Sequence, residues 1–480
     1  MASKDISFSQ IPSGIRKPGD YFEFNTSLAV RTLPGINWQL LIIAQRLAAG
    51  SVAAKVPVQV FSEADAEAYF GIGSLAHLMV RAAIKANPYL NLTVVALDDA
   101  VASVKATGTV TIANNAASTG VLALYIANDE VDIVVNTGDT PTVIAANIVA
   151  AIANMPQLPV TAAAAAGVVT LTAKNGGTVG NQIGLGYLLN NVTATTVAIV
   201  QMVNGATDPT LQDALDAVFP QQFDIVVTPF NDQANLTTVK TQLEFVSNAI
   251  EQRPGIGVYA TNGALAAATT LAGEVNDGRV YPFLLRFTAG TTQRTSAAYE
   301  IAAAYGAEIA TEPDPARPLN TLPLTGIAVP AIADRLSRAE QEACLANGVT
   351  PGEVGPGEVV QIVRAISSYT LNPAGVPDIS LLDITTIRTL DYVRAAIRTR
   401  IALRFPREKL STKTPPKVRS EIIDVLKQLE ALEIVENVDA NLPGVIVELD
   451  LQDPNRLDAK IPTDVVNGLH VFAAVIDLIL

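Results

Sequence analysis

The pattern of apolar and polar positions predicts two kinds of structure along the chain. From Trp38 onward, buried strands alternate with helices: "WQLLIIA" predicts a strand, "SEADAEAYF" a helix capped by Ser62, and "SLAHLMVRAAIKAN" a second helix before the strand "LNLTVVAL". The same rhythm resumes at "FDIVVTPF" and continues through "GIGVYAT" and "RVYPFLLRF". We therefore predict a central α/β domain built from two separate stretches, residues 28–100 and 206–324.

The stretch between these halves has a different pattern. Short alternating runs such as "TGTVTIA", "GVLALYIA" and "GVVTLTAK" are separated by Gly and Asn turns, with one Ala-rich helix among them. Its six charged residues are Lys105, Asp129, Glu130, Asp132, Asp139 and Lys174. We interpret residues 101–205 as an inserted, β-rich, peripheral domain, and we expect it to fold independently.

The proline-dense "TEPDPARPLNTLPL" predicts a boundary, after which residues 325–465 read as an α+β C-terminal domain. Residues 1–27 have extended character and predict an N-terminal arm. Residues 466–480 form a second arm, in which Val471 to Leu480 contain one charge, Asp477, and predict a strand buried on both faces. A strand of this kind is an aggregation hazard unless something pairs with it, so its partner has to be identified.

Composition narrows the class of protein. The chain has 480 residues, enough for several domains, and its hydrophobic content of 49% fits extensive subunit contact. No apolar run reaches the length of a membrane span, and we expect no membrane insertion and no secretory signal. The single Cys344 excludes an internal disulfide and suits assembly in a reducing cytoplasm. A net charge of -14 argues against a general nucleic-acid binder.

Candidate catalytic chemistry is sparse. His77, His470 and Cys344 do not form a metal-ligand or Cys/His pattern, and we interpret both histidines as structural. "GIGSLA" has the glycines of a dinucleotide loop but follows a predicted helix, so we interpret it as a turn between helices. "PGEVGPGE" is interpreted as a turn, and acid pairs such as Asp98 with Asp99 as solvated charges. We expect no enzyme activity, no cofactor and no bound metal.

One charge feature stands apart. Residues 384–420 contain ten basic side chains against two acidic ones, in an otherwise acidic chain. Two hypotheses are open: a solvated helix face, or a contact surface for an acidic partner or for an acidic patch on a neighbouring copy. Nucleic acid is the weaker alternative, because the stretch has few aromatic residues.

Long stretches resemble the tail sheath proteins of Mu-like contractile phages. They are "ISFSQIPSGIRKPGDYFEF", "FSEADAEAYFGIGSLAHLM", "GAEIATEPDPARPLNTLPLTGIAVP", "RAEQEACLANGVT", "ISSYTLNPAGVPDISLLDITTIRTLDYVRAAIRTRIALRFPREKL" and the ending "QDPNRLDAKIPTDVVNGLHVFAAVIDLIL". The resemblance implies a structural subunit in a helical homo-oligomer of hexameric rings around a tail tube, which contracts to drive the tube through the host envelope. It also implies contacts with tube, baseplate and tail terminator proteins in the virion.

The resemblance further implies that arms of neighbouring subunits complete the sheet of the C-terminal domain by strand addition. The candidate arm residues are Ile6, Phe8, Ile11, Tyr21, Phe22, Phe24, Val471, Phe472, Val475, Ile476, Leu478, Ile479 and Leu480. In this family the C-terminal domain lies against the tube, so the candidate residues for contact with the tube or a neighbour are Arg388, Arg394, Arg398, Arg400 and Arg404.

Two alternatives come from other classes. The β-rich insert could bind a surface glycan and make the protein an adhesin, although Tyr125 and Tyr187 are its only aromatic residues. A nucleotide-binding α/β enzyme is the other alternative, and it would carry its cofactor through purification.

Overall fold

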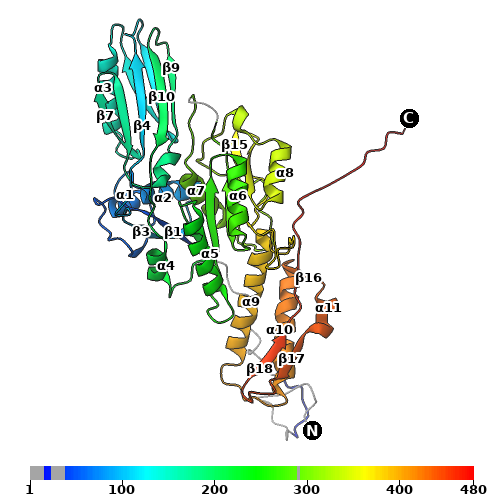
Figure 1. Cartoon of the computed structure of the whole chain (residues 1–480). Coiled ribbons are helices and arrows are strands. Elements are labelled where there is room, and N and C mark those ends of the chain that lie inside the picture. The colour runs from blue at the N-terminus through cyan, green and yellow to red at the C-terminus, as the bar shows by residue number, and fades with distance from the viewer. Residues whose placement is uncertain (1–15, 23–37, 289–291, 480) are drawn as a thin grey trace.

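The computed structural model describes residues 16–22, 38–288 and 292–479. Figure 1 shows three parts in a row: a β-rich domain at the top, an α/β domain in the middle and a helical part at the lower end. The C-terminal residues leave the body as an extended segment on the right of the view.

The middle part, which we call the central domain, is built on a sheet that has eight strands within the described residues. Their order is β15-β14-β13-β12-β11-β1-β3-β2, and neighbouring strands from β3 to β14 run parallel. Both faces are covered, which explains the continuous apolar runs of the strands. The strands are β1 (Gln39–Gln45), β2 (Pro57–Gln59), β3 (Asn91–Leu97), β11 (Ile225–Val227), β12 (Ile256–Thr261), β13 (Val280–Leu284), β14 (Thr350–Gly355) and β15 (Val359–Ile362).

Helices pack around this sheet. Ser62 caps the first of them as predicted, since its Oγ accepts a hydrogen bond from the backbone N–H of Asp65 at 3.1 Å. One helix, α7, is buried along its whole length and packs against α2, which explains its small, alanine-rich sequence. The helices are α1 (Glu63–Phe70), α2 (Leu75–Ala86), α4 (Gln212–Val218), α5 (Gln233–Ser247), α6 (Leu265–Val275), α7 (Ala298–Ile309) and α8 (Arg338–Ala346).

The chain leaves the central sheet after β3 and returns for α4 and β11, and the excursion forms the top part, which we call the insert. It has a hydrophobic core of its own between two sheets, with strand orders β10-β4-β8-β7 and β6-β5-β9. Its elements are β4 (Thr107–Ala113), β5 (Gly120–Ile126), β6 (Asp129–Val135), α3 (Pro141–Ala153), β7 (Val160–Ala165), β8 (Val168–Ala173), β9 (Leu185–Asn190) and β10 (Thr196–Val203).

The lower part is a helical hairpin with short strands, and it has a separate hydrophobic core. Strand β17 pairs with β18, and β16 pairs with β19, both antiparallel. The elements are α9 (Ile384–Arg404), α10 (Thr414–Ala431), β16 (Val435–Glu436), α11 (Val438–Asn441), β17 (Ile446–Leu449), β18 (Leu457–Lys460) and β19 (Asp464–Val465).

The expected domain boundary at residue 325 is contradicted by the sheet. Strand β14 pairs in parallel with β13, so the chain is still part of the central sheet beyond residue 350. The proline-dense stretch runs along the edge of that sheet, where the backbone N–H of Leu324 donates to the carbonyl of Val360 at 2.8 Å. Residues Thr350–Gly355, expected to lie mostly in a turn, form β14, which continues through residues 356–358 into β15.

No helix in the described ranges combines the length and apolar character that a membrane span requires.

Candidate assembly surfaces and a buried histidine cluster

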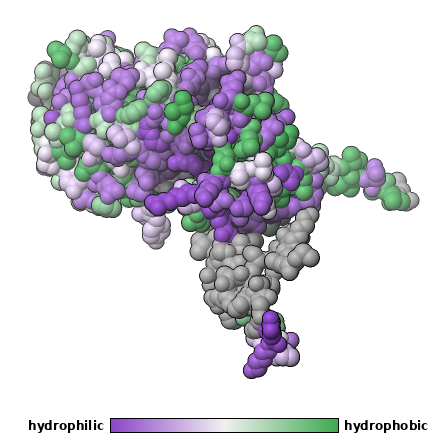
Figure 2. Space-filling model, turned by 90° about the horizontal axis from the view of Figure 1, so that it is seen from below, coloured by the Kyte–Doolittle hydropathy of each residue, from purple (hydrophilic) through white to green (hydrophobic). Residues whose placement is uncertain are grey.

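The C-terminal segment exposes its apolar side chains. After β19 the described residues up to Ile479 form no strand, and Val471, Phe472, Val475, Ile476, Leu478 and Ile479 are each 78–95% exposed. Figure 2 shows this segment as a largely green projection beside a mostly purple body. The predicted strand is therefore not formed among the described residues, and its pairing with another chain stays a prediction.

The root of this segment is fixed to the body by His470. The Asn320 side-chain amide donates to Nδ1 of His470 at 3.0 Å, and Nε2 lies 3.5 Å from a carboxylate oxygen of Asp383. Burial lowers the pKa of His470, so the neutral ring is favoured. The free part of the segment thus starts at Val471.

The N-terminal candidates are only partly visible. Tyr21 is 40% exposed, and its hydroxyl donates to the carbonyl of Lys17 at 2.9 Å, while Phe22 is 88% exposed. Four N-terminal candidates and one C-terminal candidate lie outside the described residues: Ile6, Phe8, Ile11, Phe24 and Leu480.

The hairpin of β17 and β18 offers open strand edges. Within the described part of the chain, each of these strands pairs only with the other, so their outer edges keep unpaired backbone groups. A two-stranded sheet is only marginally stable by itself, and open edges accept additional strands.

The upper arginines of α9 bind the central domain. The Arg388 guanidinium stacks over the Trp38 ring at 4.4 Å, and its Nη2 donates to the carbonyl of Glu312 at 2.5 Å. Burial lowers the pKa of Arg388 to about 10. Arg394 donates to the carbonyl of Ser247 at 2.9 Å, which ties α9 to the end of α5. Both arginines therefore make contacts within their own chain.

The exposed Arg398 makes a longer contact, 3.2 Å from its Nη1 to the carbonyl of Gln252.

The lower arginines of α9 bind α10. Arg400 is 4% exposed and forms ion pairs with Asp424 at 2.6 Å and Glu421 at 3.1 Å. Arg404 lies 3.5 Å from the same Glu421 carboxylate. These pairs hold the two helices of the hairpin together, and α9 therefore connects the central domain to the lower core. A spacing of 17 to 24 residues between bases and acids on two neighbouring predicted helices is the sequence signal for such pairing.

Four exposed basic residues lie on the loop between α9 and α10 and in the first turn of α10. Arg407, Lys409, Lys413 and Lys417 are all exposed, and Lys417 pairs with Glu408 at 2.8 Å. We call these four residues the basic loop. Sequence reasoning counted them in the basic stretch but placed the contact on α9. Two prolines, Pro406 and Pro415, are the signal that a turn carries these charges.

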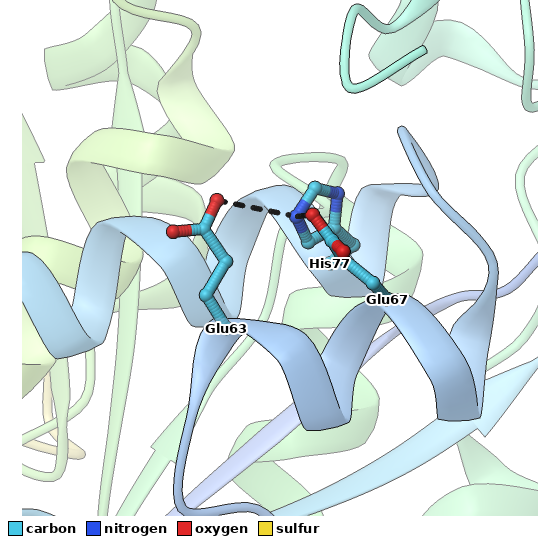
Figure 3. A group of neighbouring side chains, drawn as sticks. All are labelled: Glu63, Glu67 and His77. Carbon is cyan, nitrogen blue, oxygen red and sulfur yellow. Dashed lines mark ion pairs between the residues drawn. The ribbon is translucent and has the colours of Figure 1, made fainter.

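His77 lies fully buried near two carboxylates of α1, as Figure 3 shows. Its Nε2 is 3.4 Å from Glu63 and 3.7 Å from Glu67. The backbone N–H of Gly73 donates to Nδ1 at 3.0 Å. Burial lowers the His77 pKa to about 4, so the ring is neutral at pH 7.

This geometry does not suit a metal ion. A neutral imidazole has one lone pair in the ring plane, and Gly73 already uses the lone pair of Nδ1. The hydrogen therefore sits on Nε2, where a metal would need a free lone pair. Nε2–H instead faces Glu63 and Glu67, and we interpret the cluster as a polar contact between α1 and α2.

Other candidate chemistry is also structural in the described residues. Gly71 to Ser74 form the turn between α1 and α2, and Ser74 caps α2. Cys344 is buried, and burial raises the pKa of its thiol to about 11. Asp98 pairs with Arg46 at 2.8 Å.

A cavity of about 510 Å³ lies between α9 and the central sheet. Its lining includes Gln39, Ile225 and Ile256, which are the first residues of β1, β11 and β12. Parallel sheets bind nucleotides outside the carboxyl ends of their strands, which is the opposite edge. The cavity therefore gives no support to the nucleotide-binding alternative.

Comparisons with known proteins agree with the resemblance. The family model "Phage tail sheath protein central domain" matches residues 204–368, and "Phage tail sheath C-terminal domain" matches residues 376–479. A curated relative, the Mu-like prophage FluMu tail sheath protein of Haemophilus influenzae, is 33% identical over 492 residues, covering 99% of this chain and 100% of the relative.

Solved structures share the fold. The sheath tail protein of Desulfitobacterium hafniense aligns with a TM-score of 0.52 and 15% identity, covering 94% of this chain and 97% of that one. The sheath of an extracellular contractile injection system in its contracted state aligns with a TM-score of 0.51 and 10% identity, covering 97% and 98%. On the full-length relative and the two family models, the chain belongs to the tail sheath proteins of Mu-like phages, the structural subunits of a contractile virion tail.

Proposed function

We propose that this sheath subunit polymerises as hexameric rings stacked around the tail tube, and that the stack contracts to drive the tube through the host envelope. The proposed partners are further copies of the chain, the tail tube protein, and the baseplate and tail terminator proteins. The observation that carries the proposal is the exposed apolar C-terminal segment, which has no strand partner among the residues that the structure describes. Family membership supplies the context.

The proposed bond between subunits is strand addition. Residues from Val471 onward would pair with the open edge of the β17–β18 hairpin in a neighbouring subunit, and the N-terminal arm from Ile6 to Phe24 would do the same. Burying one large aliphatic or aromatic side chain stabilises by about 1.5–3 kcal/mol, while ordering one residue costs about 1–2 kcal/mol. One arm therefore contributes little net free energy, and a lattice with many arms is stable.

The proposed contact with the tube is electrostatic. Arg388, Arg394, Arg400 and Arg404 are engaged inside the chain, so we place this contact on the exposed Arg398 and on the basic loop. An exposed ion pair is worth about 0–1 kcal/mol, so several pairs set the register while each subunit can still detach.

Imaging of the purified full-length protein by negative-stain electron microscopy tests the proposal. Striated tubes with six-fold averages in end view support it, both alone and with tail tube protein added. A monodisperse monomer under every assembly condition, in the presence of the tube protein, would contradict it.

The adhesin alternative finds no support on the outer face of the β10-β4-β8-β7 sheet. The cross-strand row Val200, Thr109, Thr170 and Ala163 is typical of this face, which carries no aromatic or charged side chain among the described strand residues. Binding to a glycan array by the isolated insert would revive the alternative.

A further inference from the structure

The junction between the insert and the central domain contains more than the two covalent connections. The segment between β8 and β9 reaches back to the central domain and meets Asp99, which lies on the outgoing connection. One Asp99 oxygen accepts hydrogen bonds from Nε2 of Gln45 at 2.7 Å and from Nδ2 of Asn175 at 2.9 Å. The other accepts from the backbone N–H of Gly176 at 2.7 Å. Asp99 thus joins β1 of the central domain to the insert.

Asn175 extends this contact to α2. Its Oδ1 accepts from the backbone N–H of Leu75, the first residue of α2, at 2.9 Å, and its Nδ2 donates to the carbonyl of Arg46 at 3.0 Å. Gln45 is fully buried and Asn175 is 7% exposed. Removing one partner while the junction stays closed would leave a buried polar group unpaired, which is costly.

A second contact holds the returning connection. Asp208 accepts from the backbone N–H of Thr178 at 2.7 Å and from the Thr178 hydroxyl. Asn181 and Gly205 exchange two hydrogen bonds of 2.9 and 2.8 Å. The same β8–β9 segment is therefore fixed from both connections.

A third contact lies at the turn between β5 and β6. Arg81 of α2 pairs with both carboxylate oxygens of Asp129, at 2.9 and 3.3 Å, and its Nη2 is also 3.4 Å from the buried Glu300 of α7. The Asn128 amide donates to the carbonyl of Gly326 at 2.6 Å. This contact is separate from the Asp99 contact, so it resists rotation about the two connections.

Glycines allow the two domains to approach closely. A Cβ added to Gly184 of the insert would lie 2.2 Å from the Thr295 hydroxyl, and a Cβ added to Gly73 would lie 2.5 Å from the carbonyl of Leu158. Gly73 also has a φ of +77°, which other residues rarely adopt. The junction is packed at the level of the backbone and leaves no room for sliding.

We propose that the insert and the central domain form one rigid body, held by a clamp made of the Asp99, Asp208 and Arg81–Asp129 contacts. The insert then follows every displacement of the central domain without lag, and its uncharged sheet face keeps one orientation in the particle. This differs from a tethered adhesion module, which samples many orientations. The proposal concerns the monomer and does not depend on the proposed function.

Spin-label distance measurements test the clamp. Tyr89 of the central domain is 95% exposed and Val200 of the insert is 57% exposed, so Tyr89→Cys with Val200→Cys gives two accessible labels, while Cys344 is buried. The wild-type background is expected to give one narrow distance distribution, no wider than the label rotamers allow. A broad or bimodal distribution in that background would overturn the proposal.

The clamp variant is Asp99→Ala with Asp129→Ala and Asp208→Ala, which removes all three contacts, and the control is Asp132→Ala, an exposed acid of β6. We expect the distribution to widen at least twofold in the clamp variant and to stay unchanged in the control. If circular dichroism shows the clamp variant unfolded, Asp99→Asn replaces it, because it keeps the shape and removes the charge. An unchanged width in a folded variant would show that these aspartates do not hold the junction.

Discussion

The insert and the C-terminal segment are both rich in apolar residues, but only the insert buries them within its own fold. The insert closes two sheets over its own core and keeps its few charges at edges and turns. The segment after His470 places six large apolar side chains in solvent. A domain that buries its apolar side chains in its own core needs no partner to stay out of water. A segment with exposed apolar side chains can bury them only by binding another surface. We therefore expect the C-terminal segment to carry the contacts that drive assembly.

The largest expected effect on assembly comes from removing the exposed apolar C-terminal segment. Deletion of Val471–Leu480 should leave a folded, soluble monomer that forms no tubes, because the body ends at the His470 contact. Sedimentation and electron microscopy measure this. Tubes of normal length from the truncated protein would show that assembly does not need the C-terminal segment. Deletion of residues 1–20 should also block assembly, while a charge change on the insert, Asp132→Ala, should not.

The comparison also predicts different behaviour of isolated pieces. Residues 101–205 expressed alone should fold as a monomer with a β-rich circular dichroism spectrum, since their core is internal. Residues 376–480 should associate, and association should disappear when the last ten residues are removed. An unfolded insert fragment would mean that its core depends on the central domain.

Acid should weaken the central domain at the base of the insert. Burial lowers the pKa of His77 from 6.5 to about 4 in the folded state. Between these pH values the unfolded chain binds the proton more strongly, so the stability that neutral His77 contributes is present above pH 6.5 and lost as pH falls towards 4. The expected loss is at most about 3 kcal/mol. Denaturant unfolding of wild type and His77→Gln across this range measures it, and equal pH slopes would contradict it.

A smaller effect is expected at the hairpin that carries the free segment. Arg400→Met should destabilise the lower core by about 1.5–3 kcal/mol, because Asp424 and Glu421 lose a charged hydrogen-bond donor. The control is Arg398→Met, whose side chain is exposed. Denaturant midpoints compare the two. Equal midpoints would place Arg400 among the dispensable surface charges.

The smallest effect should come from the basic loop. Lys409→Glu with Lys413→Glu should weaken co-sedimentation with tail tube several-fold at low salt and less at high salt, because exposed pairs are weak and screened. Lys105→Glu in the insert is the control. Arg394→Glu with Arg398→Glu tests the helix instead. If neither pair changes binding at any salt concentration, the tube contact lies elsewhere.

The sequence predicted those features that depend only on residues close together in the chain. The apolar run of β1, the Ser62 cap and the charge-poor insert all follow from neighbouring residues, and the structure has each of them. The boundary at 325 failed because prolines at a sheet edge have the same local pattern as prolines in a linker. The partners of Arg388 and Arg400 are distant in sequence, so spacing along one helix could not identify them.

His470 fixes the point from which the C-terminal segment departs, and this sets a length. Ten residues from Val471 to Leu480 reach at most about 35 Å when fully extended. If the segment docks on a neighbouring subunit as proposed, its docking site must lie within about that distance of Asn320 and Asp383. If the segment stays bound while the sheath contracts, it acts as a tether. The extended length of its ten residues then limits how far adjacent subunits can shift relative to each other.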